Sequence, residues 1–314
     1  MVLKMAESVI TVSNLTKRYG DFAAVDDIDF EVYKGEVFSI LGPNGAGKTT
    51  TVEIMECLKT KTSGTVSILG MDIEGAVREI KKRIGVLPQD FNAFDLLTVK
   101  ENIDYFGGMF RQRLDAETLI KLVELEDKRD EYFKNLSGGL KQRVGVAISM
   151  VNDPDIIFLD EPTTGLDPKA RREVWEVVKG LKAQGKTVIL TTHYMEEAEV
   201  LSDRVAIMNR GKFIALGTPR EIIERHGSGT TLVVRGGNSA AFEQLKDISP
   251  RVELKGNDVV VRVDRKEVLP EAILRLERSG AYYEEIQLRR ATLEDVFLSL
   301  TGKRLADGDE AAEA

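Results

Sequence analysis

The segment GPNGAGKTT at residues 42–50 constrains the fold of this chain more than any other feature. Its glycines let consecutive backbone N–H groups turn inward on one phosphate without a Cβ clash. Lys48 is placed to neutralise phosphate charge, and Thr49 carries a hydroxyl suited to Mg²⁺. An apolar segment, Glu36–Leu41, precedes the loop, and a helical segment from about Lys48 to Leu58 follows it. This order predicts a buried strand, a phosphate-binding loop and a helix whose positive dipole end faces the phosphate.

A second feature is an apolar strand, Ile156–Glu161, that ends in two carboxylates. Burial of charge is costly without a cation, and Mg²⁺ would supply one. We therefore predict that Asp160 holds the magnesium, largely through water, and that Glu161 polarises the attacking water. The alternative is that the strand simply runs out to solvent and Asp160 caps a turn. The glycine loop at the matching point upstream favours the catalytic interpretation.

A third feature is LSGG at residues 136–139, which precedes a helix with one apolar face. Ser137 could be no more than the N-cap of that helix. Such a cap does not explain the adjacent Gly138 and Gly139, which weaken a helix start unless something must approach closely. A helix N-terminus with exposed N–H groups and a hydroxyl is an anion site. We therefore expect Ser137, Gly138 and Gly139 to contact a γ-phosphate.

The order of predicted elements indicates a large α/β domain over residues 8–225. Its first forty residues read as antiparallel strands, whereas helices and strands alternate from residue 137 on, as is typical of a mainly parallel sheet. A helical subdomain is expected at about residues 92–138. No apolar stretch has the length of a membrane span, and the N-terminus lacks the apolar region of a signal peptide. We therefore expect a cytoplasmic protein.

The end of the chain has a different pattern, which predicts a small accessory domain over residues 230–303. The segment HGSGT at 226–230 is the best candidate for a linker. The elements after it follow the order βαββαβ, which is ferredoxin-like, and a capping box at Thr292 begins a last helix. Residues 304–314 are expected to form a flexible acidic tail. The net charge of −8 argues against nucleic acid as a partner, since phosphate neutralisation needs clustered Lys and Arg.

Taken together, these motifs over about residues 8–220 resemble the ATPase subunits of ATP-binding cassette (ABC) transporters. The resemblance implies a P-loop NTPase cassette of the α/β class. Such a cassette has an N-terminal antiparallel β subdomain, a mainly parallel core sheet and an inserted helical subdomain. The cofactors implied are ATP and Mg²⁺. The loop residues assigned to ATP are Gly42, Pro43, Asn44, Gly45, Ala46, Gly47, Lys48, Thr49 and Thr50.

Four further residues match motifs of that family. Tyr19 matches the aromatic residue that stacks on adenine, although a tyrosine at a strand edge is the plainer alternative. Gln89, in VLPQ, matches the glutamine that senses the magnesium and the nucleophilic water. Asp167, in TGLD, matches the loop that crosses a dimer interface. His193 follows a predicted strand, where ligands bind in parallel sheets, and matches the switch histidine that contacts the γ-phosphate.

One departure from the family pattern lies in the LSGG segment. The usual continuation is glutamine, and this chain has Leu140 in its place. Gln142 lies two positions further on, a rotation of about 200° around a helix, and cannot take the same role. We therefore expect the phosphate contact through Ser137 to survive, and contacts to the partner's ribose to be altered.

The resemblance also implies partners. Two copies should close head to tail around two ATP, each held between one glycine loop and the other copy's Ser137. The strings RGKFIALGTP and ATLEDVF, at residues 210–219 and 291–297, resemble ATPase subunits of the ABC-2 exporter group. A separate ABC-2-type membrane permease is therefore expected, with this chain peripheral on the inner face of the membrane. The alternatives are a soluble ABC-family ATPase of DNA repair or translation, an importer ATPase subunit, and a regulator that does not hydrolyse ATP.

Overall fold

The computed structural model describes residues 7–227, 229–263, 265 and 267–301. Contacts divide them into two compact units, residues 7–219 and 220–301, each of which is considered by itself. The division falls at the start of α8 (Pro219–His226), a few residues before the glycine-rich stretch that the sequence singles out as a linker. Within the described residues no helix combines the length and the apolar character needed to cross a membrane.

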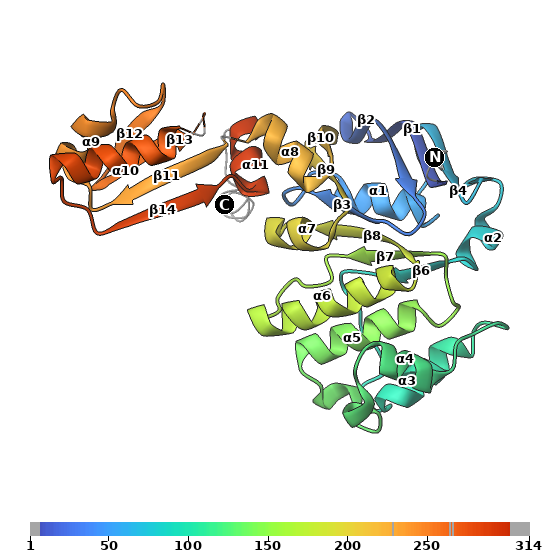
Figure 1. The fold of residues 1–314 in the computed structure, drawn as a ribbon. Coiled ribbons are helices and arrows are strands. Elements are labelled where there is room, and N and C mark those ends of the chain that lie inside the picture. Colours follow the sequence, from blue (N-terminus) through green and yellow to red (C-terminus); the bar gives the residue numbers. More distant parts are fainter. Residues whose placement is uncertain (1–6, 228, 264, 266, 302–314) are drawn as a thin grey trace, which may run out of the picture. The chain divides into compact units, whose positions relative to one another are not determined.

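A six-stranded sheet forms the centre of the first unit, in the order β10-β9-β3-β8-β7-β6 (Figure 1). Its strands are β3 (Val37–Leu41), β6 (Ile84–Leu87), β7 (Ile156–Asp160), β8 (Thr187–Thr192), β9 (Arg204–Asn209) and β10 (Lys212–Gly217). All neighbours pair in parallel except β10, which is antiparallel to β9. Every residue of β3, β7 and β8 is buried, which explains their continuous apolar sequences, because both faces of a parallel sheet are covered.

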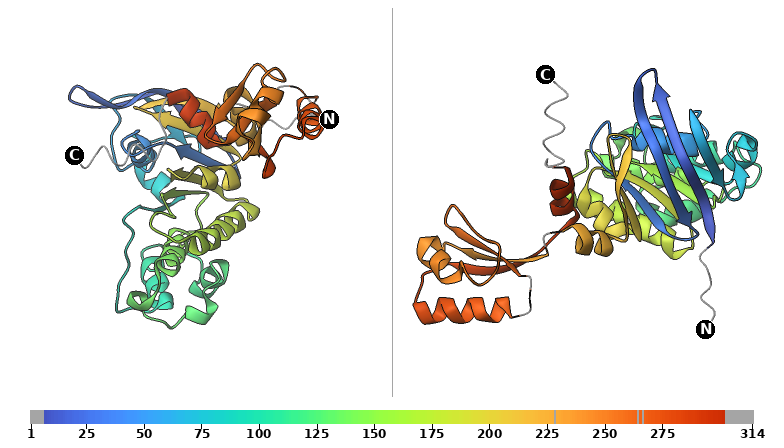
Figure 2. Two further views of the ribbon diagram at one scale, coloured as in Figure 1. Left: turned by 90° about the vertical axis from the view of Figure 1, so that its left-hand side faces the viewer. Right: turned by 90° about the horizontal axis from the view of Figure 1, so that it is seen from above.

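An antiparallel sheet of order β2-β1-β4-β5 forms the N-terminal part of this unit (Figure 2). Its strands are β1 (Ser8–Tyr19), β2 (Phe22–Tyr33), β4 (Ser63–Ile68) and β5 (Met71–Asp72). One apolar cluster joins this sheet to α1 (Lys48–Met55) and the central sheet. Helix α1 ends before the predicted Leu58, because Cys57 adopts a left-handed backbone with φ 57° that cannot continue a helix.

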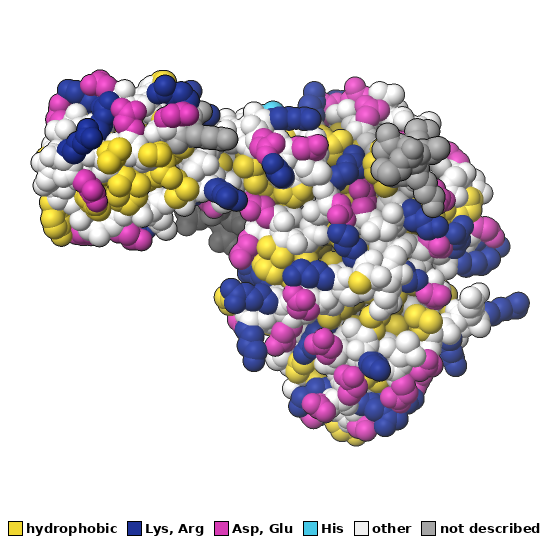
Figure 3. Space-filling view, in the orientation of Figure 1, with side chains coloured by type: hydrophobic (Ala, Val, Ile, Leu, Met, Phe, Trp, Pro, Cys, Tyr) yellow, Lys and Arg dark blue, Asp and Glu magenta, His cyan; other side chains and the backbone are white. Residues whose placement is uncertain are grey.

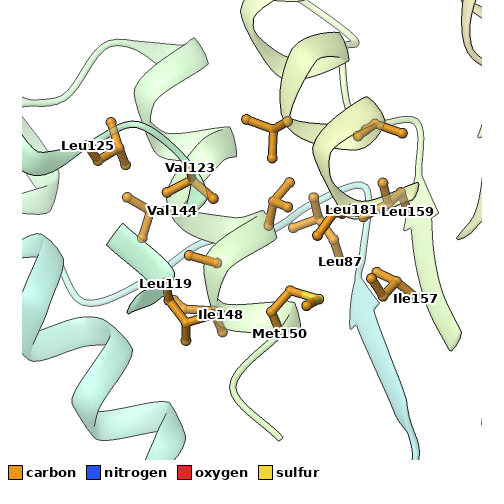
Figure 4. Close-up of a cluster of buried hydrophobic side chains, with 14 of the residues drawn as sticks. Leu87, Leu119, Val123, Leu125, Val144, Ile148, Met150, Ile157, Leu159 and Leu181 are labelled. Carbon is orange, nitrogen blue, oxygen red and sulfur yellow. The ribbon is translucent and has the colours of Figure 1, made fainter. Parts of the chain in front are cut away.

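Helices pack against the central sheet and build the inserted helical subdomain. They are α2 (Val77–Lys81), α3 (Val99–Gly107), α4 (Ala116–Leu122), α5 (Gly138–Ser149), α6 (Pro168–Ala183) and α7 (Met195–Leu201), with 3₁₀ turns at Glu126–Lys128 and Phe133–Asn135. A capping box at Thr98 begins α3, and Asp115 caps α4. The largest apolar cluster runs from α3 and α4 through α5 to the strands, and Figure 4 shows Leu119, Val144 and Ile157 within it.

The second unit has the predicted βαββαβ order. Its elements after α8 are β11 (Thr230–Arg235), α9 (Asn238–Leu245), β12 (Val252–Lys255), β13 (Asp258–Val263), α10 (Val268–Ser279), β14 (Glu285–Arg290) and α11 (Leu293–Thr301). The sheet order β12-β13-β11-β14 is antiparallel throughout, which is the ferredoxin-like arrangement. Thr292 and Asp295 exchange the hydrogen bonds of the predicted cap. The acidic tail predicted at residues 304–314 lies outside the described residues.

Charged side chains of both signs are interspersed over the face drawn in Figure 3. The whole chain has 44 basic and 52 acidic residues. On this face the two signs are mixed, so it offers no single-sign field that would steer a charged ligand.

The buried cluster predicts a test of the helical subdomain. Leu119 is fully buried at 0% exposure, so Leu119→Ala should lower the free energy of unfolding by about 2–5 kcal/mol through lost burial and a cavity. Leu96 is 71% exposed in the same subdomain, and Leu96→Ala should change it by less than about 0.5 kcal/mol. Urea unfolding of both variants measures the contrast, and equal effects would contradict the assigned core.

Candidate active site

Three neighbouring parallel strands, β3, β8 and β7, end at the same edge of the central sheet. The glycine loop follows β3, Glu161 follows β7, and His193 follows β8. Ligands of open α/β sheets bind outside the carboxyl ends of the strands. The fold therefore brings together, at one edge, three predicted site residues that lie far apart along the chain.

The glycine loop is tightly packed against the rest of the unit. Gly47 has φ 108°, and a Cβ built on it would lie 2.3 Å from the carbonyl oxygen of Ala24. No other residue can occupy this position without displacing the backbone. The N–H of Gly211 donates to the carbonyl of Ala46 at 2.8 Å, and the N–H of Gly42 donates to that of Thr192 at 3.3 Å. The loop is thus held in place by its surroundings before any phosphate arrives.

Lys48 is the cation of the site. Its Nζ lies 3.0 Å from Oε1 of Glu161, and the two side chains are only 4% and 5% exposed. The same Nζ donates to the carbonyl oxygens of Gly42 at 2.9 Å and Pro43 at 3.3 Å. The ammonium group therefore lies within the curl of the loop, where a phosphate could accept its hydrogen bonds in place of those carbonyls.

Glu161 is held by three different elements. Besides Lys48, its Oε2 contacts Nδ1 of His193 at 2.9 Å and accepts from the hydroxyl of Thr164 at 3.0 Å. Burial alone would raise the pKa of Glu161, but the hydrogen bond with His193 and the charge of Lys48 lower it to about 2. Glu161 also has a left-handed backbone with φ 48°, which is uncommon for a residue with a side chain. Such strain persists only where the surroundings over-determine the position.

Asp160 lies beside Glu161 but in a different environment. Burial raises the pKa of Asp160, and the negative charge of Glu161 adds to that effect, while hydrogen bonds from Thr191 and Thr49 oppose it. The hydroxyl of Thr191 donates to Asp160 and accepts the N–H of Glu161 at 3.0 Å. One threonine therefore holds the carboxylate of Asp160 and the backbone of Glu161.

The donor set around Asp160 fits a magnesium ion bound together with a phosphate. Thr49 and Asp160 are within hydrogen-bonding reach and both present oxygen atoms. Among the described residues there is no group of three or more acidic, His or Cys side chains that could enclose a metal. Mg²⁺ characteristically binds through one or two protein oxygens, with water and substrate phosphates completing its shell.

Two predicted site residues are not brought into this network. Gln89 lies just beyond the end of β6, next to the end of β7, and its side chain is exposed. Tyr19 is the last residue of β1 and is 47% exposed, with Nζ of Lys17 at 5.0 Å from the centre of its ring. Their proposed roles with magnesium and adenine stay predictions.

The LSGG segment lies at the start of α5. Ser137 is the N-cap, and its hydroxyl accepts the N–H of Leu140 at 3.5 Å. A Cβ at position 139 would lie 2.7 Å from Cβ of Ala170 on α6, so Gly139 is required by helix packing whatever it binds. Ser137 and Gly138 are exposed, and no contact joins them to Lys48 or Glu161 within the described chain. Leu140 packs against the apolar cluster of the helical subdomain, which accounts for an apolar residue at this position.

Asp167, which the family resemblance assigns to a dimer interface, is the N-cap of α6 and accepts the N–H groups of Lys169 and Ala170 at 2.8 and 2.9 Å. Other polar residues of the site were not predicted from the sequence. Threonines carry much of the remaining hydrogen bonding, as the contacts of Thr164 and Thr191 show. The sequence does not predict their role, because a threonine in an apolar strand or a turn belongs to no motif that marks a site. Each of them nevertheless lies within three residues of Glu161 or His193.

The buried ion pair generates a stability prediction. Lys48→Met leaves the Glu161 carboxylate buried without its cation and should lower the free energy of unfolding of the nucleotide-free protein by about 3 kcal/mol. The matched control is Lys100→Met, which breaks a pair with Asp104 that is 33% and 48% exposed and should cost less than about 1 kcal/mol. Urea unfolding at pH 7 with EDTA measures both, and losses of equal size would contradict the importance of the pair.

The chain matches two family models. Residues 25–164 match the family described as ABC transporter, and residues 217–301 match the C-terminal domain described as ATP-binding protein DrrA1-3-like. The two matches lie in the first and the second unit, apart from the first residues of the latter.

Relatives match nearly the whole chain. The Nod factor export ATP-binding protein I of Burkholderia lata is 40% identical over 309 residues, which cover 96% of this chain and 100% of the relative. The daunorubicin resistance ATP-binding protein DrrA3 of Streptomyces coeruleorubidus is 38% identical over 308 residues, covering 95% of this chain and 97% of the relative.

Solved structures resemble the first unit. The ATP-binding cassette MJ0796, in a dimeric post-hydrolysis state with ADP and Pi, has a TM-score of 0.60 and 30% identity over 67% of this chain and 98% of its own. The cbiO1 subunit from Clostridium perfringens has a TM-score of 0.64 and 27% identity over 70% of this chain and 92% of its own. This chain therefore belongs to the ATP-binding, ATP-hydrolysing subunits of ABC transporters, in the ABC-2 exporter group.

Proposed function

We propose that this chain hydrolyses ATP to power export of a substrate through a separate membrane permease. The names of its relatives, a Nod factor exporter subunit and a daunorubicin resistance subunit, support export as the direction of transport. The observation that carries the hydrolytic role is the buried Glu161 carboxylate, held beside Lys48 and His193 at the edge where parallel strands end. A regulator that only binds ATP would not need this arrangement.

In the proposed mechanism, the glycine loop from Gly42 to Thr50 holds the phosphates and Lys48 leaves its loop carbonyls for them. Glu161 orients and polarises the attacking water, and His193 positions Glu161 through its Nδ1 contact. Thr49, Asp160 and Gln89 would hold Mg²⁺, which neutralises charge on the phosphates when bound. The half-exposed ring of Tyr19 offers a face on which adenine can stack.

Dimer closure is the proposed link between ATP and transport. One chain leaves Ser137 and Gly138 exposed at a helix N-terminus, which suits the phosphate of a second copy's nucleotide. Asp167, at the start of α6, would lie in the same interface. A relative of known structure is dimeric with ADP and Pi. ATP bridging both copies favours the closed state by differential contacts, and hydrolysis removes them.

The proposed docking site of the permease is a groove of about 620 Å³ beside the helical subdomain. It lies next to Gln89, and it is lined by apolar side chains of β6, α3, α5 and the loops around them, including Val86, Phe91, Phe106 and Ile148. Exposed apolar residues are part of this lining, namely Leu58 at 59% and Met109 at 63%. Contiguous exposed apolar surface marks an interaction site. Binding there would place the chain on the cytoplasmic face of the membrane.

The first prediction concerns the general base. Glu161→Gln should slow Mg-ATP hydrolysis by roughly 10²–10⁴-fold and prolong the ATP-bound dimer. Phosphate release measures the rate, and gel filtration with ATP measures the dimer. Glu173→Gln, a change on the partly exposed partner of Arg143, serves as the control and should keep the normal rate. A Glu161 variant that hydrolyses normally would exclude this residue as the base.

The second prediction concerns the composite site. Ser137→Ala and Lys48→Ala should each inactivate the homodimer, because each removes one half of both sites. A mixture of the two variants should regain activity, because one of its two sites contains both Lys48 and Ser137. Asp115→Ala, which removes the N-cap of α4, controls for the loss of a cap alone and should stay active. A mixture as inactive as its components would contradict the two-chain site.

A further inference from the structure

The groove beside the helical subdomain contains a buried acid that hydrolysis does not use. Glu56, the C-cap residue of α1, lines the groove and is only 4% exposed. No hydrogen bond or ion pair joins its carboxylate to another side chain in the described part of the protein, whereas Glu36 and Glu197, the other buried glutamates outside the active site, both have partners. Buried polar groups are normally hydrogen-bonded, so the isolation of the Glu56 carboxyl calls for an explanation.

No neighbouring positive charge among the described residues pairs with the carboxylate of Glu56. Burial and the negative charges of Asp160 and Glu53 raise the pKa of Glu56 to about 8, and Lys81 opposes this only weakly. Lys81 lines the same groove, but it is exposed and lies outside ion-pair distance. Helix α1 also has no basic residue in its last turn, although its C-terminal carbonyls carry negative partial charge. These surroundings favour the protonated form of Glu56, and only a cation brought next to it would keep it ionised at neutral pH; the described residues place none within ion-pair distance.

The apolar side chains that line the groove indicate what kind of partner segment would fit it. Apolar side chains from three segments line it, namely Val86 in β6, Phe106 in the last turn of α3 with Phe110 just after that helix, and Ile148 on α5. A helix inserted into such a groove would present apolar residues to these walls. If such a helix also carried a basic residue, that side chain could reach Glu56 at the end of α1.

We propose that Glu56 receives a lysine or arginine side chain from a helix that the membrane permease inserts into this groove. The proposal rests on the proposed function, since it needs a permease, and it adds the chemistry by which the permease is recognised. Pairing would hold Glu56 in its ionised form, with a cation at the wall of the groove where the chain itself supplies none within ion-pair distance among the described residues.

The first experiment uses the complex of this chain with its natural membrane partner. The chain, carrying a photo-crosslinking residue at the exposed groove position Leu58, is purified with its membrane partner from detergent-solubilised membranes of its host. Mass spectrometry then identifies the crosslinked segment, which should be helical and apolar and should contain a Lys or Arg. If no membrane protein co-purifies with the wild-type chain, the proposed function itself fails. A crosslink to a second copy of this chain, or to a segment without a basic residue, overturns the inference alone.

The second experiment tests the proposed pair by measuring how Glu56 variants bind the partner and how stable they are on their own. Glu56→Gln should weaken binding of the purified partner roughly 30-fold or more, because it leaves a buried cation without its acid. In contrast, the same variant without its partner should be about as stable as the wild type, because a mainly protonated carboxyl group is replaced by an amide of the same shape. Glu79→Gln, on the neighbouring α2 and 60% exposed, is the matched control and should change neither. Unchanged affinity, or a loss of stability in the free chain, overturns the inference.

A charge exchange gives an independent readout. Glu56→Lys should abolish partner binding, and changing the crosslinked Lys or Arg of the partner to Glu should restore it. Nucleotide binding and the melting temperature of Glu56→Lys establish that the variant is folded. Restoration by the exchanged partner supports a direct pair, while a folded variant that the exchange does not restore contradicts it.

Discussion

The buried contact between Lys48 and Glu161 is the interaction on which the rest of this site depends. It joins the loop after β3 to the residue after β7, and His193 adds the end of β8. Each of these elements is positioned by the parallel sheet, so the ion pair can form only when the sheet is complete. Lys48 also donates to the carbonyl oxygen of Gly42, a hydrogen bond that a phosphate held by the loop could take over.

The two carboxylates illustrate how environment separates neighbouring acids. Glu161 is surrounded by Lys48, His193 and Thr164, which favour its ionised form. Asp160 is buried beside a negative charge and depends on hydroxyl groups for stabilisation. The first stays ionised at neutral pH and can orient a water molecule through a hydrogen bond, and the second favours a cation. The same logic extends to Glu56, which is buried near Asp160 and has no cation of its own.

The helical subdomain is built by packing constraints that also shape its exposed end. Gly139 lets α5 approach Ala170 on α6, and Leu140 adds to the apolar cluster beneath. The helix start that carries Ser137 is thereby fixed by packing on one side and left exposed on the other. Leu140 stands where the family usually has glutamine. Its apolar side chain packs against the cluster beneath α5 and so stabilises the position of this helix, rather than making contacts to a partner.

The sequence by itself determined the elements, the order of the ferredoxin-like unit and the chemistry of the main motifs. Short local patterns suffice for these, since a glycine loop, an apolar strand and a cap each depend on neighbouring residues. Only the tertiary structure decided which distant residues meet. Thr164 and Thr191 became part of the site, Asp167 became a helix cap, and Glu56 lines a groove without a partner among the described residues. The burial and the pairing of these side chains depend on contacts between segments that are far apart in the sequence. The spacing of residues within one segment therefore cannot predict them.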